Sequence, residues 1–147
     1  MRFGIFIKCP QIEIVEACGI SKLDFVVIDM EHTPLGPRDL YPLVLASQNR
    51  DIELMVRVPT NREEYIKWAL DLGVTNIQVP QIESAEDAAQ AIQTGFYGEK
   101  GNRGLCRFVR AADFSNMAKD QYLEHANQTT KLTLQIEGKR GIENLDA

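Results

Sequence analysis

The stretch FVVIDMEH, running from Phe25 to His32, decides the fold class. Its first four residues are apolar and mostly β-branched, which predicts a strand buried on both faces, as in a parallel sheet covered by helices. Two carboxylates and an imidazole follow where this strand should end. Parallel α/β proteins build their sites at the carboxyl ends of their strands, so chemistry is expected here.

Working outward, strand-like segments alternate with helix-like segments along the whole chain. The predicted strands cover residues 3–8, 25–29, 53–58, 76–80 and 131–137. Two predicted helices have both ends defined and cover residues 11–18 and 113–127. Four others are predicted: one begins near residue 37, one follows the third strand, one begins at residue 84 and one begins at residue 141. This alternation predicts a parallel sheet with right-handed crossovers.

Three of the helices carry apolar residues at helical spacing, which predicts the face that each one buries. The three stripes are Leu40, Leu43, Val44 and Ser47, then Tyr65, Trp68, Ala69 and Leu72, and finally Ala85, Ala88, Ala89 and Ile92. Ser84, with Asp87 three residues later, predicts a capping-box start for the last of these helices.

Five strands fit either a small doubly wound sheet or the first five strands of a (β/α)8 barrel, which typically needs about 250 residues. In the fifth segment, apolar residues at 132, 134 and 136 alternate with Thr133, Gln135 and Glu137. A polar face on a central parallel strand is costly unless it lines a site, as it does inside a barrel. We therefore predict an α/β fold of (β/α)8 TIM-barrel type, with residues 1–147 as a single domain forming its amino-terminal part.

Composition indicates an ordinary globular protein, with 44% hydrophobic and 25% charged residues. The net charge of −5 argues against nucleic acid as a partner, because a nucleic-acid binder carries a basic patch. One loop does gather four cations, which could meet an anionic small molecule or a partner subunit. They are Lys100, Arg103, Arg107 and Arg110.

The sequence also predicts where the protein works. No stretch approaches the roughly 20 apolar residues that cross a bilayer, and no signal-peptide pattern opens the sequence, so we expect no membrane partner. The three cysteines lack metal-type spacing, and Cys9 and Cys18 are expected to pack as small apolar residues in a reducing compartment. A cytoplasmic protein is expected.

Three further predicted strands also run into polar residues, namely Arg57, Gln81, and the pair Gln135 and Glu137. Collected at one rim with His32, these side chains suit metal-assisted chemistry on a small anion. A glutamate can bind a hard divalent cation, and an arginine can hold a carboxylate or a developing enolate oxygen. An imidazole can exchange protons near neutral pH.

Each candidate also has a structural interpretation that the sequence leaves open. Asp29 could cap the following loop, and His32 could be a polar turn residue. Arg57 could form a structural ion pair with a nearby glutamate, and Glu137 could face water before a glycine turn.

Several motifs, taken together and in order, resemble the HpcH/HpaI family of class II, metal-dependent pyruvate aldolases, typified by 4-hydroxy-2-oxoheptanedioate aldolase. The likeness covers essentially all 147 residues. The matching segments are residues 25–32, Val56-Arg57-Val58-Pro59, Ala69-Leu70-Asp71-Leu72-Gly73, Val79-Pro80-Gln81-Ile82, Gly101-Asn102-Arg103-Gly104, Arg110-Ala111-Ala112 and Leu134-Gln135-Ile136-Glu137.

The resemblance implies reversible aldol cleavage of a 4-hydroxy-2-oxo acid to pyruvate and an aldehyde. Glu137 would ligate a divalent metal (Mg²⁺, Mn²⁺ or Co²⁺), and Gln135 would touch the pyruvate moiety of the 2-oxo acid substrate. Arg57 would bind the oxygen that becomes the enolate. His32 would move a proton, oriented by Asp71 and with Asp29 nearby.

The resemblance also implies a homo-oligomer, and one departure from the family pattern. The family's second carboxylate ligand lies at the end of a sixth strand, which this sequence does not reach. The alternative expectation is a shortened, non-catalytic subunit of the same family that assembles with partners.

Overall fold

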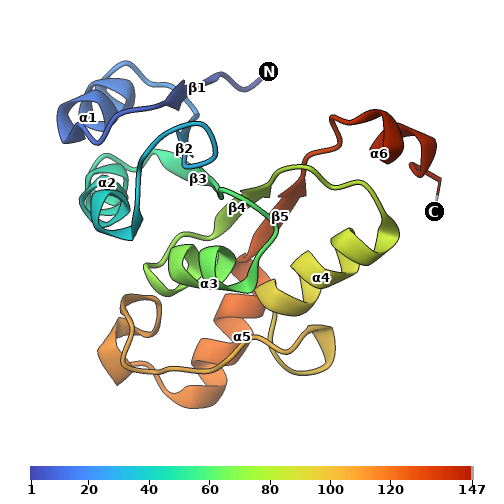
Figure 1. Cartoon of the computed structure of the whole chain (residues 1–147). Helices are drawn as coiled ribbons and strands as arrows, with labels where there is room; N and C mark the ends of the chain where they lie inside the picture. Colours follow the sequence, from blue (N-terminus) through green and yellow to red (C-terminus); the bar gives the residue numbers. More distant parts are fainter. Residues whose placement is uncertain (147) are drawn as a thin grey trace.

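Five parallel strands form one sheet in the order of the sequence, β1-β2-β3-β4-β5 (Figure 1). The strands are β1 (Gly4–Ile7), β2 (Phe25–Asp29), β3 (Glu53–Arg57), β4 (Asn76–Val79) and β5 (Lys131–Leu134). The helices are α1 (Ile12–Ile20), α2 (Pro37–Asn49), α3 (Glu63–Asp71), α4 (Ala85–Gly95), α5 (Lys119–Thr129) and α6 (Lys139–Glu143), with the 3-10 turns η1 (Gly98–Lys100) and η2 (Arg110–Ser115). This computed structural model describes residues 1–146.

One face of the sheet is apolar and packs against the helices. Ile28, Val56, Ile77 and Leu132 form one row across four strands, and the first three are fully buried. Consecutive helices contact one another in chain order, α1 with α2, α2 with α3 and α3 with α4, along one side of the sheet (Figure 1). The predicted α/β architecture is thus confirmed.

The opposite face carries polar residues on β4 and β5, as the alternation in the fifth segment predicts. Asn76 donates to Glu53 across β3 and β4 at 2.7 Å. Gln78 of β4 donates to Gln135, directly after β5, at 2.6 Å. The regular strand β5 is shorter than predicted and ends at Leu134, so Gln135 and Glu137 lie in the segment that follows it.

The predicted buried faces agree with the structure to a different extent in each of the three helices. All four predicted residues of α2 are buried. The prediction succeeds there because leucine and valine mark the buried face of a helix clearly. In α3, the predicted Ala69 is buried and Tyr65 and Leu72 pack against the core. Trp68 is 44% exposed, however, and the buried Ile66 and Leu70 lie outside the predicted stripe, so the buried face is rotated from it. The α4 stripe is largely wrong: Ile92 is exposed, and the buried residues are Ala91, Thr94 and Gly95.

The α4 error has a physical reason. Alanine is common on both faces of a helix, so four alanines define no direction. The start of α4 is as predicted, because Ser84 accepts the backbone N–H of Asp87 at 3.1 Å and Asp87 accepts that of Glu83 at 3.1 Å.

The helix predicted over residues 113–127 begins late. Asp113, Phe114 and Ser115 have φ values of 48°, 51° and 74°, which lie in the left-handed region and cannot continue a right-handed helix. The chain therefore makes the turn η2 and starts α5 only at Lys119. The terminal helix begins at Lys139, two residues before the predicted start.

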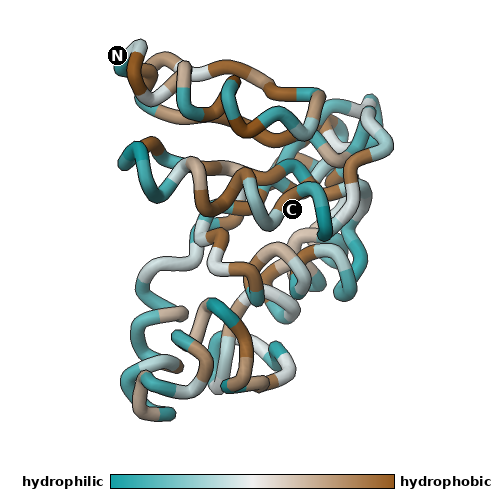
Figure 2. The backbone as a smooth tube through the Cα atoms, turned by 90° about the vertical axis from the view of Figure 1, so that its left-hand side faces the viewer, coloured by the Kyte–Doolittle hydropathy of each residue, from teal (hydrophilic) through white to brown (hydrophobic). Residues whose placement is uncertain are grey.

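A second, smaller core lies beneath the sheet and joins this turn to α5. Tyr97, Ala112, Tyr122 and Ala126 are buried together. Figure 2 shows hydrophobic residues concentrated in the upper part, where the sheet lies, with a smaller group in the lower part. Within residues 1–146, no helix combines the length and the apolar character needed to cross a bilayer.

The main core generates a matched stability prediction. Ile66 of α3 is fully buried, whereas Ile92 of α4 is 42% exposed. Truncating Ile66 to alanine should lower the free energy of unfolding by about 2–5 kcal/mol, because the buried site loses contacts and leaves a cavity. The control, Ile92→Ala, should cost less than about 1 kcal/mol. Urea unfolding of both variants measures the difference, and equal losses would contradict the packing described here.

Candidate active site at the carboxyl ends of the strands

A connected set of polar side chains follows β2, β3, β4 and β5 at the carboxyl edge of the sheet. We call it the strand-end network, and its members are Asp29, Glu31, Arg57, Gln81, Gln135 and Glu137. Each is linked to another member by at least one hydrogen bond or ion pair. The predicted gathering of these residues at one rim is what the structure shows.

Asp29 and Arg57 form the centre of the network. They are partners in register at the ends of β2 and β3. Arg57 donates from Nε to Oδ1 at 3.0 Å and from Nη2 to Oδ2 at 2.9 Å, a bidentate pair. The side chain of Asp29 is fully buried, and Lys8 Nζ lies 3.3 Å from its Oδ2. Phe6 covers the Arg57 guanidinium at 4.9 Å from the ring centroid.

The ionisation of Asp29 is set by opposing effects. Burial acts to raise its pKa, but the hydrogen bonds from Arg57 and from the backbone N–H groups of His32 and Glu31 outweigh burial and lower the pKa to about 2. Asp29 therefore caps the loop after β2 and pairs with Arg57 at the same time. The hydrogen bond to Asp29 likewise raises the pKa of Arg57.

Glu31 links the central pair to the next strand. Its Oε1 accepts from Gln81 Nε2 at 3.0 Å. Its Oε2 lies 3.3 Å from Arg57 Nη1 and 3.6 Å from His32 Nε2, and accepts no hydrogen bond from the described residues. Since the side chain is only 5% exposed, this buried oxygen is ready to accept from a bound molecule.

Glu137 is held at the far end of the network. Its Oε1 accepts the backbone N–H of Gln81 at 3.1 Å, and its Oε2 accepts from Gln135 Nε2 at 2.5 Å. Gln81 has a φ of 57°, an uncommon value for a residue with a side chain. In that conformation its backbone N–H donates to Glu137 while its side-chain amide donates to Glu31.

Two predicted site residues differ in position. His32 lies at this rim, exposed and beside Glu31. Asp71 lies at the end of α3, where it accepts from Arg103 Nη2 at 2.8 Å. Its structural partner is therefore Arg103, and within one chain the structure does not bring Asp71 to His32.

The donor set tests the predicted metal. Among residues 1–146, no group of three histidine, cysteine or acidic side chains is arranged to hold a metal ion. Glu137 supplies one carboxylate beside the amide of Gln135. Mg²⁺ often takes one or two carboxylates, with water and substrate oxygens completing its shell. The residues thus fit one protein-derived ligand of such a site.

Sequence reasoning undervalued three contributors. Gln81 was expected only as an amide at the rim, although its position after a strand-ending proline is where a chain reversal with φ > 0 can occur. Lys8 at the end of β1 reaches Asp29. Gln78 holds Gln135 across the sheet, and its place in the alternating polar face is the signal that could have identified it.

The central ion pair gives a prediction with a definite sign. Because the pKa of Asp29 is lowered, its contribution to stability is full above about pH 4 and is lost as pH falls through about 2. The shift corresponds to about 2 kcal/mol. Asp29→Asn should lower the free energy of unfolding by about 3 kcal/mol near neutral pH, because Arg57 loses a buried partner.

Urea unfolding at a series of pH values measures this effect. The difference between wild type and Asp29→Asn should narrow by about 2 kcal/mol between about pH 4 and pH 2. Glu99→Gln, an exposed carboxylate-to-amide change, is the control and should stay within about 0.5 kcal/mol of wild type. A pH-independent difference for Asp29→Asn would contradict the described pair.

Residues 2–147 match the family described as HpcH/HpaI aldolase/citrate lyase. A 2-dehydro-3,6-dideoxy-6-sulfogluconate aldolase from Pseudomonas putida is 34% identical, covering 97% of this chain and 55% of that protein. A 5-keto-4-deoxy-D-glucarate aldolase from Klebsiella pneumoniae is 35% identical, covering 90% of this chain and 51% of that protein.

The fold comparison agrees. The crystal structure of an HpcH/HpaI aldolase/citrate lyase family protein from Burkholderia cenocepacia superposes with a TM-score of 0.92 at 30% identity, covering 99% of this chain and 58% of that one. The chain spans about half the length of the relatives it matches. From its motifs, its sheet and these matches, the chain belongs to the HpcH/HpaI aldolase/citrate lyase family.

Proposed function

We propose that this protein is a metal-dependent lyase that cleaves a 4-hydroxy-2-oxo acid to pyruvate and an aldehyde, and that also runs the reverse reaction. The observation that supports the proposal is the strand-end network with His32 beside it: a fixed cation, carboxylates and an imidazole lie at one rim of an aldolase-family sheet. The sugar-acid aldolases among the relatives support a 2-oxo acid as the substrate class.

Arg57 would stabilise the enolate. A guanidinium has five N–H donors. Asp29 takes two of them and Glu31 Oε2 faces a third, which leaves two for the oxygen that gains negative charge. Because Asp29 fixes the guanidinium before substrate arrives, little reorganisation is needed when that charge develops.

His32 would handle the proton. It accepts the proton of the C4 hydroxyl, the C3–C4 bond breaks to release the aldehyde, and the bonding electrons pass to the pyruvate enolate. Proton return to C3 then gives pyruvate. The exposed His32 can receive this proton, and Glu31 at 3.6 Å stabilises the resulting imidazolium.

Glu137 would be the protein ligand of a divalent ion, Mg²⁺, Mn²⁺ or Co²⁺, and Gln135 would contact the pyruvate moiety. When bound, the ion supplies Lewis-acid polarisation of the substrate carbonyl. The hydrogen bonds from Gln81 and Gln135 support this role because they hold the carboxylate in one orientation.

We also propose a cytoplasmic homo-oligomer. The cysteines in the described part of the chain are free thiols, as expected in a reducing compartment. Tyr41, Trp68 and Phe114 expose aromatic surface around an apolar pocket that also borders Asp71. If a second copy covers this surface, the remote position of Asp71 is consistent with its acting across the subunit contact.

The deciding experiment follows exchange of pyruvate methyl protons with deuterated water by NMR, with and without Mn²⁺ or Mg²⁺. Metal-dependent exchange that chelation abolishes is expected, because enolate formation is the step that releases those protons. No exchange from a folded chain would contradict the lyase proposal and favour the alternative, a non-catalytic subunit of the family.

Arg57→Lys tests the enolate role. Lysine keeps the charge but loses the planar fork, so the exchange rate should fall about 100-fold or more. Circular dichroism should confirm that the variant is folded. Near-normal exchange would contradict the role given to Arg57.

Glu137→Ala tests the metal ligand separately from turnover. Mn²⁺ affinity, measured by electron paramagnetic resonance, should fall at least about tenfold with little change in the free energy of unfolding, since Glu137 is exposed. The control is Glu99→Ala, which removes an exposed carboxylate outside the network and should leave affinity unchanged. Unaltered affinity in Glu137→Ala would overturn the assignment.

A further inference from the structure

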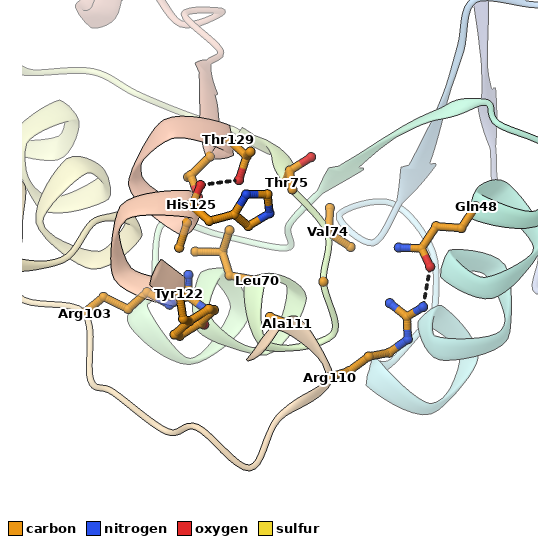
Figure 3. A pocket seen from close by; sticks show the side chains of 13 residues that line it. Gln48, Leu70, Val74, Thr75, Arg103, Arg110, Ala111, Tyr122, His125 and Thr129 are labelled. Carbon is orange, nitrogen blue, oxygen red and sulfur yellow. Dashed lines mark hydrogen bonds between the residues drawn. The ribbon is translucent and has the colours of Figure 1, made fainter. Parts of the chain in front are cut away.

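A pocket of about 240 Å³ lies at the other edge of the sheet, where β4 and β5 begin (Figure 3). Its walls come from α2, α3, α5 and the turn η2. The lining residues that matter here are Thr75, Arg103, Arg110, His125, Thr129 and Thr130. None of the pocket's residues belongs to the strand-end network, so the proposed lyase site does not account for it.

The charge of this lining has one sign. Two guanidiniums line the pocket, and its lining contains no aspartate or glutamate. Asp71, which pairs with Arg103, lies outside this lining, so Arg110 supplies the charge that is left for a ligand. This contrasts with a chain whose net charge is −5. A partly enclosed cavity lined with cations concentrates a positive potential, which favours an anionic ligand.

Arg103 offers an unused donor. Its side chain is only 2% exposed, and its Nη2 donates to Asp71 at 2.8 Å and to Tyr122 Oη at 3.4 Å. Its Nε–H, also buried, has no hydrogen-bond partner among the described residues. A buried donor left unpaired costs about 1–3 kcal/mol, so an oxygen acceptor in the pocket would recover that energy.

Arg110 forms no ion pair with a carboxylate within residues 1–146, so its charge is uncompensated there. Its Nη1 donates to the carbonyl of Leu72 at 3.2 Å, and its Nη2 donates to the side-chain oxygen of Gln48. Both acceptors are neutral. A Cβ on Gly73 would lie 2.9 Å from Arg110 Nη1, and the φ of Gly73 is +90°, so this glycine permits the close approach.

The remaining walls suit a small molecule with both polar and apolar parts. Figure 3 shows the His125 ring on the side of Thr75, and Arg110 turned toward Gln48. Leu70 and Val74 supply apolar surface. The volume lies below the roughly 300–1,000 Å³ typical of pockets for drug-sized ligands, so it fits a smaller metabolite.

We propose that this pocket binds a small organic anion. Its single carboxylate or phosphate group lies at Arg110, and another oxygen of the ligand accepts a hydrogen bond from Arg103 Nε. The site is separate from the strand-end network, so its occupancy does not depend on the lyase activity proposed above. The cation-rich loop of residues 100–110 thereby acquires a role as one wall of an anion site.

The chain supplies its own reporter, because it has two histidines, one in each site. His125 lines the pocket and His32 lies at the opposite edge. Histidine ring resonances would be followed by NMR while inorganic phosphate, glycolate or potassium chloride is added at constant ionic strength and pH. The phosphate and glycolate arms distinguish the two sources of the anionic group.

The expected result is a saturable shift of the His125 resonance with phosphate or glycolate, and a His32 resonance that moves no more than it does in chloride. Arg110→Gln should weaken binding at least about tenfold, since it removes the uncompensated charge. Arg110→Lys should bind more tightly than Arg110→Gln because the charge is kept. Lys100→Gln, an exposed change in the same loop, is the matched control and should bind as wild type does.

Three outcomes would overturn the proposal. The first is no saturable shift of His125 with either anion. The second is equal movement of both histidines, which marks general ionic effects. The third is unaltered binding in a folded Arg110→Gln variant.

Discussion

Two charges that enter the protein interior must do so together, and the ion pair between Asp29 and Arg57 meets that constraint at the ends of adjacent strands. The hydrogen bonds that Asp29 accepts from Arg57 and from the backbone of the loop after β2 offset the cost of burying its charge. Arg57 in turn presents its remaining donors to Glu31 and the rim. The loop conformation, the orientation of the guanidinium and the spacing of the outer carboxylates therefore all depend on one contact.

Much of this arrangement is readable from the sequence because it rests on strong, local signals. A run of β-branched residues that ends in Asp29 defines β2, and an apolar run that ends in Arg57 defines β3. Parallel pairing brings such ends to one rim. The polar alternation around Thr133 correctly indicates a polar face of the sheet, where Gln78 contacts Gln135, and the leucines of α2 correctly mark its buried side.

What the sequence does not show are features decided by tertiary contacts. The left-handed conformation of Gln81 follows from two partners that lie far away in the chain, Glu31 and Glu137. Asp71 is drawn to Arg103, which is 32 residues distant and carries no signal of that pairing. Alanines in α4 fit either face, so only packing selects Ala91. The pocket around Arg110 joins four separate segments and has no linear motif.

The strand order has a consequence for how the protein is made. Because each strand pairs with the one that follows it in the chain, an emerging polypeptide can add one strand at a time to an existing edge. The pairing of β5 with β4 differs from the earlier ones: Gly4 pairs with Phe25, which is 21 residues away, whereas Asn76 pairs with Lys131, which is 55 residues away. Closing that longer loop costs more chain entropy. Among these four pairings, β4 therefore waits longest for its next strand, and the basic loop and α5 emerge from the ribosome before β5 covers that edge.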